Sequence, residues 1–238
     1  MFDFIRKPEI WRAMDAGLMA EIPSKLSFQL KTMQDLAMYA LLRGMKDQTI
    51  AEIGGGDSRI LPQLAKSNRC FNIEPFEGAD NGPKGEVKIA GVENIRTTVG
   101  RFDPTLKDAS FDVVFSVSVV EHVADPEFPA FLEDNIRILK PGGVMYHAID
   151  MYLSDSPTDF WRDRFDMYRK AVTERDDLVP IGPIGAIQPA FTPDMASNPD
   201  QIMYGWKKIS PSLNDLRQIS QSVSLLIGAK RNGAVENQ

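Results

Sequence analysis

Residues 49–61 read TIAEIGGGDSRIL, and this stretch decides the fold class. Its first five residues are mostly apolar, which is typical of a short buried strand. A glycine turn follows at residues 54–56, where the backbone can bend sharply and a ligand can approach without a Cβ atom in the way. Residues 58–66 then predict a short helix. The stretch therefore predicts a strand, a turn open to a ligand, and a helix.

The same alternation of strands and helices continues downstream. Further strands are expected at residues 70–73, 95–99, 111–117 and 144–149. A helix is expected at 127–139, and the Pro-Gly-Gly run at 141–143 ends it. Residues 75–92 are rich in glycine and proline and predict a loop where a full helix would normally stand. Alternating strands and helices favour parallel crossovers, so we expect an α/β fold with a doubly wound, mostly parallel sheet.

The regions on either side of this core differ from it in texture. Residues 1–47 predict an N-terminal helical segment, because apolar residues recur every three or four positions from Leu26 to Leu41. Residues 151–238 predict a substrate-side cap that ends in a terminal strand. Its expected parts are a helix at 153–175, an irregular loop or lid at 180–200, and a last helix and strand at 214–228. With the core at 48–150, the whole chain, 1–238, is expected to form one domain.

Composition narrows the class of protein. The chain has 238 residues, 43% of them hydrophobic, and a formal net charge of −6. It has no apolar run long enough to span a bilayer, and its charged, proline-containing start is unlike a secretory signal, so we expect a cytoplasmic protein without membrane contact. The acidic balance argues against a nucleic-acid partner. With two histidines and one cysteine, the sequence predicts no metal site.

An acidic residue at the end of the second strand points to a nucleoside. Glu74 lies twenty residues after Gly54, where a carboxylate can accept both hydroxyls of a ribose. The dinucleotide fingerprint would place a third glycine at Arg59, and the turn also lacks the Gly-Lys-Ser/Thr ending of a phosphate-binding loop. A ligand with adenine and ribose but no phosphate therefore suits this turn best.

Four stretches carry a family resemblance. They are AEIGGGDSRIL (51–61), FNIEPFEG (71–78), SFDVVFSVSVVEHVADP (110–126) and IRILKPGGVMYHAID (136–150). In order and spacing they resemble the class I S-adenosylmethionine-dependent methyltransferases that act on small molecules. The resemblance implies a Rossmann-like methyltransferase fold and S-adenosylmethionine as the cofactor.

The resemblance also implies roles for particular residues. Glu52 and the glycine turn, Gly54, Gly55 and Gly56, would hold the methionine end of the cofactor. Glu74 would bind the ribose. The other expected cofactor contacts are Asp57, Pro75, Arg101, Phe102, Ser116 and Val117.

The chain departs from the family pattern at three places. Ser58 stands where the third turn glycine is usual, and the helix expected between the second and third strands is missing at 75–92. Arg101 occupies the place of an acidic residue that commonly lies near the adenine amine, with Phe102 or Asp103 as candidate substitutes.

Three residues are candidate general bases for the methyl acceptor. His122, His147 and Asp150 all follow or end strands of the predicted sheet, on the edge where open α/β sheets bind ligands. A histidine can accept a proton at neutral pH, with a carboxylate fixing its tautomer. Both histidines could instead be structural. Asp150 could instead ligate a divalent metal, although the sequence shows no further oxygen ligands for one.

The sequence thus favours transfer of a methyl group from S-adenosylmethionine to a small molecule or sugar, with oxygen as the preferred atom. A sugar is included among the expected acceptors because HAIDMYLSDSP (147–157) resembles a stretch in methyltransferases associated with bacterial surface polysaccharides. One alternative is a non-catalytic, cofactor-binding or scaffolding protein with the same fold. Another is a nicotinamide oxidoreductase, which Arg59 disfavours. The oligomeric state stays open.

Overall fold

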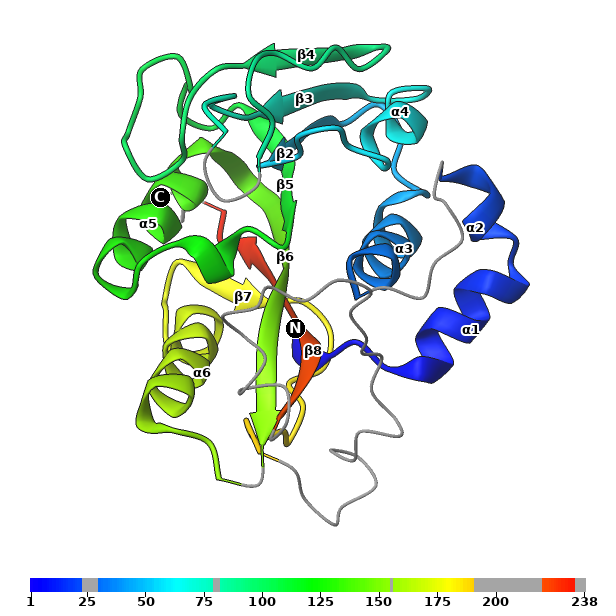
Figure 1. The fold of residues 1–238 in the computed structure, drawn as a ribbon. Coiled ribbons are helices and arrows are strands. Elements are labelled where there is room, and N and C mark those ends of the chain that lie inside the picture. The colour runs from blue at the N-terminus through cyan, green and yellow to red at the C-terminus, as the bar shows by residue number, and fades with distance from the viewer. Residues whose placement is uncertain (23–29, 79–81, 155, 191–219, 234–238) are drawn as a thin grey trace.

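One twisted sheet runs through the centre of the molecule (Figure 1). The computed structural model describes residues 1–22, 30–78, 82–154, 156–190 and 220–233. Within them, eight strands are arranged in the order β1-β8-β6-β5-β2-β3-β4, and β7 also pairs with β8. The strands are β1 (Phe2–Phe4), β2 (Thr49–Ile53), β3 (Arg69–Ile73), β4 (Val92–Ile95), β5 (Phe111–Val117), β6 (Leu139–Ser154), β7 (Leu178–Pro180) and β8 (Ser220–Arg231).

The centre of this sheet is parallel and one side of it is antiparallel. Strands β4, β3, β2, β5 and β6 all run in the same direction. Strand β8 returns antiparallel along β6, and β1 and β7 pair antiparallel with its other edge. The mostly parallel sheet expected from the sequence is therefore confirmed.

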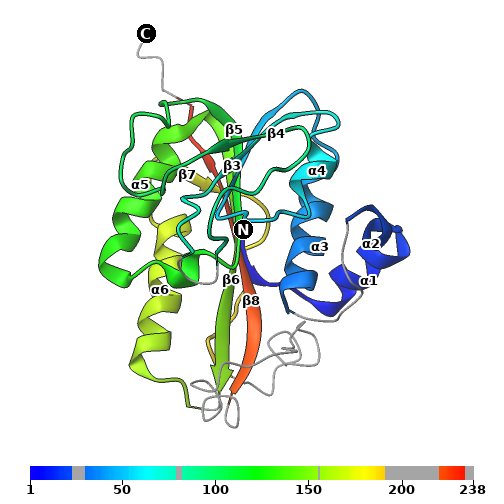
Figure 2. The same cartoon turned by 45° about the horizontal axis from the view of Figure 1, so that its top comes forward.

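Helices cover both faces of the sheet (Figure 2). On one face lie α1 (Lys7–Asp15), α2 (Leu18–Glu21), α3 (Leu30–Leu42) and α4 (Leu61–Leu64), and on the other lie α5 (Phe128–Ile138) and α6 (Asp159–Thr173). Each face has its own core of buried apolar side chains. Two short 3₁₀ helices, η2 (Val120–His122) and η3 (Asp125–Glu127), lie between β5 and α5. The doubly wound arrangement is thus confirmed.

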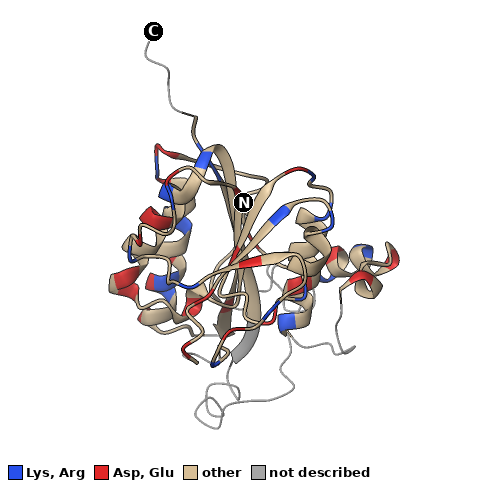
Figure 3. Cartoon of the chain, turned by 90° about the horizontal axis from the view of Figure 1, so that it is seen from above, with Lys and Arg blue, Asp and Glu red and all other residues tan. Residues whose placement is uncertain are grey.

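Charged residues of both signs are interspersed over the outer helices (Figure 3). Several of them form ion pairs, for example Arg137 with Asp108 and Arg175 with Glu133. Within the described residues, no helix has both the length and the apolar character that a membrane span requires.

Some boundaries differ from those that the sequence predicts. The first segment contains a strand, β1, as well as helices, because three residues are too few to show a period. The strand expected at 95–99 lies earlier in the chain, because β4 spans Val92–Ile95 and shares only Ile95 with the prediction. Strand β6 is longer than 144–149, because pairing with β8 extends it to Ser154.

The expected cap is described only in part. Residues 181–190 have no regular secondary structure beyond isolated bridges at Ile184 and Ala190, as expected for an irregular loop. Residues 191–200 of the expected lid and residues 214–219 of the expected last helix lie outside the described residues, and residues 220–222 belong to β8 rather than to a helix. Leu26 also lies outside them. The division of the chain into one domain with a core and a cap stays a prediction.

Candidate active site

The carboxyl ends of β2, β3 and β5 bring most of the predicted site residues to one edge of the sheet. Ile53 pairs with Ile73 on one side and with Ser116 on the other. The next residues along these strands, Gly54, Glu74 and Val117, therefore lie side by side. The backbone N–H of Gly54 also donates to the carbonyl of Ile73 at 2.9 Å. This is the edge where open α/β sheets bind ligands.

The glycine turn is fixed by close packing. Gly54 has a φ of +63°, and a Cβ atom there would lie 2.6 Å from the Cγ2 atom of Val119. A Cβ atom on Gly55 would lie 2.7 Å from the Oδ1 atom of Asn72. Neither position can carry a side chain without moving its neighbours. The turn is therefore a specific structure rather than a generic loop.

The buried side chain of Glu52 stabilises this turn through Ser58. It is 3% exposed and accepts a short hydrogen bond from the hydroxyl of Ser58. The same hydroxyl oxygen accepts hydrogen bonds from the N–H groups of Ile60 and Leu61, at the start of α4. Burial raises the pKa of Glu52 to about 7, although Ser58 and the charge of Lys31 act in the opposite direction. The contact of Glu52 with the methionine end of a cofactor stays a prediction.

Asn72 is a second support, which the sequence analysis missed. It is completely buried in β3, and its Nδ2 atom donates to the carbonyl of Gly56 at 3.1 Å. A buried amide inside an apolar strand normally has a specific partner. That unusual residue in CFNIE was the signal in the sequence.

Glu74 lies in a tight turn directly after β3. It is 6% exposed, and its carboxylate accepts a hydrogen bond from the backbone N–H of Phe76 at 3.3 Å. Pro75 accepts a hydrogen bond from Arg96 through its carbonyl. Asp57, which directly follows the glycine turn, is exposed. The structure thus brings Glu74 and Pro75 to the edge beside the turn, while their contacts with a cofactor stay predictions.

The loop after β4 carries Arg101 and Phe102, both exposed. The buried carboxylate of Asp134 on α5 shapes this loop. It accepts hydrogen bonds from the N–H groups of Gly100 at 2.7 Å and Phe102 at 3.0 Å, and it forms an ion pair with Arg137. The Phe102 ring is 49% exposed, on a residue with a φ of +52°. An exposed aromatic ring held by a fixed backbone is available to contact a ligand.

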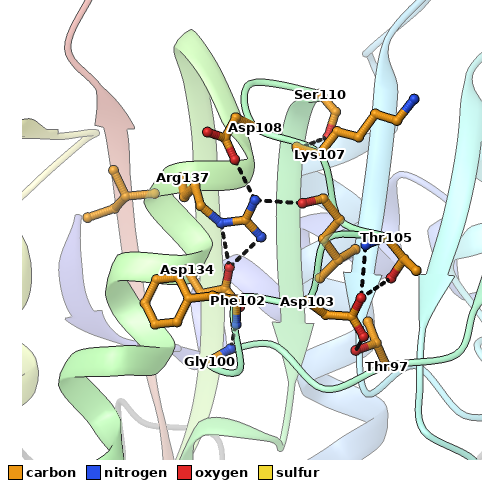
Figure 4. Close-up of polar contacts among 12 residues, drawn as sticks. Thr97, Gly100, Phe102, Asp103, Thr105, Lys107, Asp108, Ser110, Asp134 and Arg137 are labelled. Atoms are coloured by element: carbon orange, nitrogen blue, oxygen red, sulfur yellow. Dashed lines mark hydrogen bonds and ion pairs between the residues drawn. The ribbon is translucent and has the colours of Figure 1, made fainter.

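Asp103 is engaged within the same loop. Its carboxylate accepts hydrogen bonds from the hydroxyl of Thr97 at 2.6 Å and from both the N–H and the hydroxyl of Thr105 (Figure 4). The bonds from Thr97 and then Thr105 lower the pKa of Asp103. Of the two candidate substitutes for the adenine contact, Phe102 is therefore the one with a free surface.

Ser116 and His147 face the interior instead of the edge. The Ser116 hydroxyl lies 2.8 Å from the Nδ1 atom of His147, and both side chains are buried on the α5 face, where the imidazole packs against Phe131. Burial lowers the pKa of His147 to about 3, so the ring is neutral at physiological pH. The geometry favours a structural role for His147. A cofactor at this strand end would meet backbone atoms of Ser116 and Val117.

A polar cluster lies at the same edge, around the end of β5 and the neighbouring part of β6. Asp150 accepts a hydrogen bond from Gln34 at 2.7 Å, and the Ser118 hydroxyl lies within hydrogen-bond distance of both residues. Lys31, also on α3, donates from its Nζ atom to the carbonyl of Val117 at 2.7 Å. The cluster thus joins α3 to the end of β5 and to the neighbouring part of β6.

Glu121 and His122 complete this polar cluster. The Glu121 side chain is 10% exposed, and the Nε2 atom of His122 lies 4.0 Å from its Oε1 atom. Desolvation, and after it the charge of Asp150, raises the pKa of Glu121. Desolvation also raises the pKa of Asp150, although Gln34 and Ser118 oppose this. Both side chains therefore keep a proton to a higher pH than an ordinary carboxylate does.

Two of the three predicted bases, His122 and Asp150, therefore come together, and the third, His147, does not join them. Lys31 and Gln34 could not be identified as site residues from the sequence, since the apolar stripe of that helix indicated only a core element. The described residues hold no group of three or more His, Cys, Asp or Glu side chains arranged to bind a metal. That the site holds no metal stays a prediction.

Comparison with known proteins places this geometry in context. Residues 51–147 match the family model described as "Methyltransferase domain". The ubiquinone biosynthesis O-methyltransferase of Paramagnetospirillum magneticum is 32% identical over 118 residues, which cover 46% of this chain and 43% of that protein. Its counterpart from Maricaulis maris is 29% identical over 128 residues, which cover 53% of this chain and 50% of that protein. The chain thus spans half or less of the length of these relatives.

Solved structures show the same fold at low sequence identity. Phosphoethanolamine N-methyltransferase 2 of Haemonchus contortus, bound to phosphomonomethylethanolamine and S-adenosylhomocysteine, superimposes with a TM-score of 0.55 at 14% identity, covering 84% of this chain and 52% of that one. The N-methyltransferase NodS of Bradyrhizobium japonicum, bound to S-adenosylhomocysteine, gives 0.52 at 13% identity, covering 94% and 98%. These similarities concern the fold alone.

Proposed function

Since residues 51–147 belong to the class I S-adenosylmethionine-dependent methyltransferase family, we propose that the chain transfers a methyl group from S-adenosylmethionine to a hydroxyl of a small molecule. The adjacency of the glycine turn, Gly54 to Gly56, and Glu74 at the carboxyl ends of β2 and β3 is the observation that carries this proposal. In this arrangement the glycine turn after one strand lets a ligand approach the backbone closely, and the carboxylate after the next strand can accept the hydroxyls of its ribose.

The charges along this edge fit the cofactor. Four carboxylates lie there, on Glu52, Glu74, Glu121 and Asp150, and the nearby Arg59 is already paired with Asp35. S-adenosylmethionine has an adenosine without phosphate, a sulfonium and an amine, so it suits an acidic edge better than an anionic nucleotide does. When bound, it supplies a methyl group on a positively charged leaving group.

The chain's own task is then to align the acceptor and to receive its proton. Alignment is proximity work, because the leaving group is already activated. An oxygen acceptor also loses a proton as the new bond forms, and Asp150 and His122 are the candidate bases at the edge. Lys31, with its ammonium near Glu52, Glu121 and Asp150, would favour an acceptor that carries or develops negative charge.

The names of the relatives also support oxygen as the acceptor atom. The relatives found by sequence are named O-methyltransferases of ubiquinone biosynthesis. Sequence similarity at this level supports the chemistry of the reaction more than the identity of the acceptor. We therefore propose an aromatic or sugar hydroxyl as the acceptor class.

A transfer assay tests this function. The protein is incubated with S-adenosylmethionine labelled in its methyl group and with a panel that contains 3,4-dihydroxybenzoate, simple hexoses and matched primary amines. We expect label in a hydroxyl compound. Transfer to the amines alone would overturn the choice of oxygen, and cofactor binding without transfer to any compound would favour the non-catalytic alternative.

A further inference from the structure

Arg164, in the middle of α6, is buried against the segment that follows β5. It is 6% exposed, and all three of its side-chain nitrogens are used. Nε donates to the carboxylate of Asp125 at 2.7 Å, Nη1 to the carbonyl of Glu121 at 2.9 Å, and Nη2 to the carbonyl of Val123 at 2.6 Å. A single side chain of α6 is therefore hydrogen-bonded at three residues to the segment between β5 and α5.

The segment held in this way, residues 118–125, forms one side of the candidate site. It begins with Ser118, which has a φ of +54°, and it contains only one short 3₁₀ helix and the first residue of another. Val119 packs against Gly54, so the segment touches the glycine turn directly. Glu121 and His122 are its contribution to the polar cluster. Such a segment has few backbone hydrogen bonds of its own and needs outside support to stay in one place.

Helix α6 is itself firmly anchored, so Arg164 has a rigid base. Phe165 makes an edge contact with Phe2 at a ring separation of 5.0 Å, and Tyr168 makes one with Phe128 at 5.2 Å. Both side chains are almost completely buried. The guanidinium of Arg164 also lies over the ring of Phe160, 5.3 Å from its centroid.

We infer that Arg164 is a positioning residue: it holds residues 118–125 so that Val119 closes on the glycine turn and Glu121 and His122 stay at the edge of the site. That this segment borders a cofactor rests on the proposed function, whereas the clamp itself rests on the contacts of Arg164. Lysine cannot replace it, because one ammonium cannot serve three acceptors in the fixed directions of a planar guanidinium.

The test compares Arg164→Lys with Arg175→Lys as a matched control. Arg175 follows the end of the same helix and pairs with Glu133 and Asp177, away from the edge of the site. Two properties are measured without any ligand: the exchange rates of the amides at 118–125, and the position of the Gly54 amide signal in a ¹⁵N–¹H correlation spectrum. S-adenosylhomocysteine affinity is then measured by calorimetry.

In the Arg164→Lys variant we expect exchange at 118–125 to rise about tenfold or more, because charged hydrogen bonds that hold this segment are lost. We also expect the Gly54 signal to move and the affinity for S-adenosylhomocysteine to fall several-fold. The Arg175→Lys variant should leave all three unchanged. The milder Asp125→Asn variant, which weakens only one of the three contacts, should raise exchange at the same amides by a smaller factor.

Two results would overturn the inference. One is exchange at 118–125 and a Gly54 signal that match the wild type in both Arg164→Lys and Asp125→Asn. The other is an increase in exchange spread evenly over the sheet in both variants, which would mean a general structural role. If the wild type does not bind S-adenosylhomocysteine, the proposed function is lost, while the exchange and the Gly54 signal still decide whether Arg164 holds the segment.

Discussion

Glu52 shows how a single buried carboxylate can shape the site and also cost stability. It orders the glycine turn through Ser58, yet burial raises its pKa to about 7 from an ordinary 4.5. The folded state therefore holds a proton on Glu52 between pH 4.5 and pH 7, where the unfolded state has released it. The contribution of protonated Glu52 to the free energy of unfolding is therefore fully present below pH 4.5 and is lost as the pH rises to about 7.

This difference predicts the pH dependence of a Glu52→Gln variant. Glutamine keeps an acceptor for Ser58 but has no proton to lose. Relative to the wild type, the variant should gain stability as the pH rises from 4.5 to 7, by up to roughly 3 kcal/mol. Urea unfolding of both proteins across this range measures it. A difference between the two proteins that stays constant with pH would mean that Glu52 is not protonated in the folded state.

Gly55 offers a second test at the scale of one residue. An alanine Cβ would lie 2.7 Å from Asn72 Oδ1 and 3.0 Å from the carboxyl carbon of Glu52, so both supports of the turn would have to move. We expect Gly55→Ala to cost about 1–3 kcal/mol of unfolding free energy. Gly44→Ala is the control, because a Cβ there meets nothing within 4 Å. Equal stability of the two variants would contradict the close packing of the turn.

Residue patterns predicted only part of the site. The position of Glu52, the glycine turn and Glu74 at the edge of the sheet could be predicted, because strand ends and turns show in the local pattern. Lys31 and Gln34 could not, since they reach the edge from a helix whose place depends on long-range packing. His147 was a plausible base by position, but the pleat of β6 turns it toward α5 and the interior.

At the scale of elements, prediction was accurate where the pattern was local. Strand β5 has the bounds expected from its β-branched run, and α5 differs from the expected helix by one residue at each end. Strand β6 was underestimated, because its second half is defined by pairing with β8, which lies far away in the sequence. A strand that depends on a distant partner shows no boundary of its own.

The loop after β4 depends on α5 through one carboxylate. Asp134 is completely buried and holds the N–H groups of Gly100 and Phe102 as well as Arg137. Replacing it with alanine would leave the two N–H groups without their acceptor, while Arg137 keeps its ion pair with Asp108. Because each unsatisfied N–H group costs about 1–3 kcal/mol, Asp134→Ala should cost about 2–5 kcal/mol. Thermal unfolding measures this, and amide exchange at residues 100–102 should rise most. Unchanged exchange at these residues would show that the loop keeps its shape without Asp134.

At the scale of the whole molecule, the first and the last of the described strands meet beside α6. Strand β1 pairs with β8, and its Phe2 and Phe4 side chains are buried against Phe165 of α6. The first strand thus closes the apolar core on the face that also carries Arg164. Strand β1 thereby connects β8 to α6, the helix that supports residues 118–125.

This arrangement makes Phe4 important for global stability. Phe4→Ala should cost about 3–5 kcal/mol, because it opens a cavity between β1, β8 and α6. Trp11→Ala is the control, since that side chain is 59% exposed and its loss should change stability little. Urea unfolding of both variants measures the difference. Equal losses would mean that β1 is dispensable for the core.

Calorimetric titration of the protein with S-adenosylhomocysteine tests the central claim most directly, carried out in parallel on the Glu74→Ala variant and on Glu77→Ala, an exposed neighbour. The account predicts binding to the wild type and to Glu77→Ala with equal affinity. It predicts at least roughly tenfold weaker binding to Glu74→Ala, because a charged acceptor for the ribose hydroxyls is lost. No binding to the wild type at millimolar ligand, or equal binding to all three proteins, would contradict it.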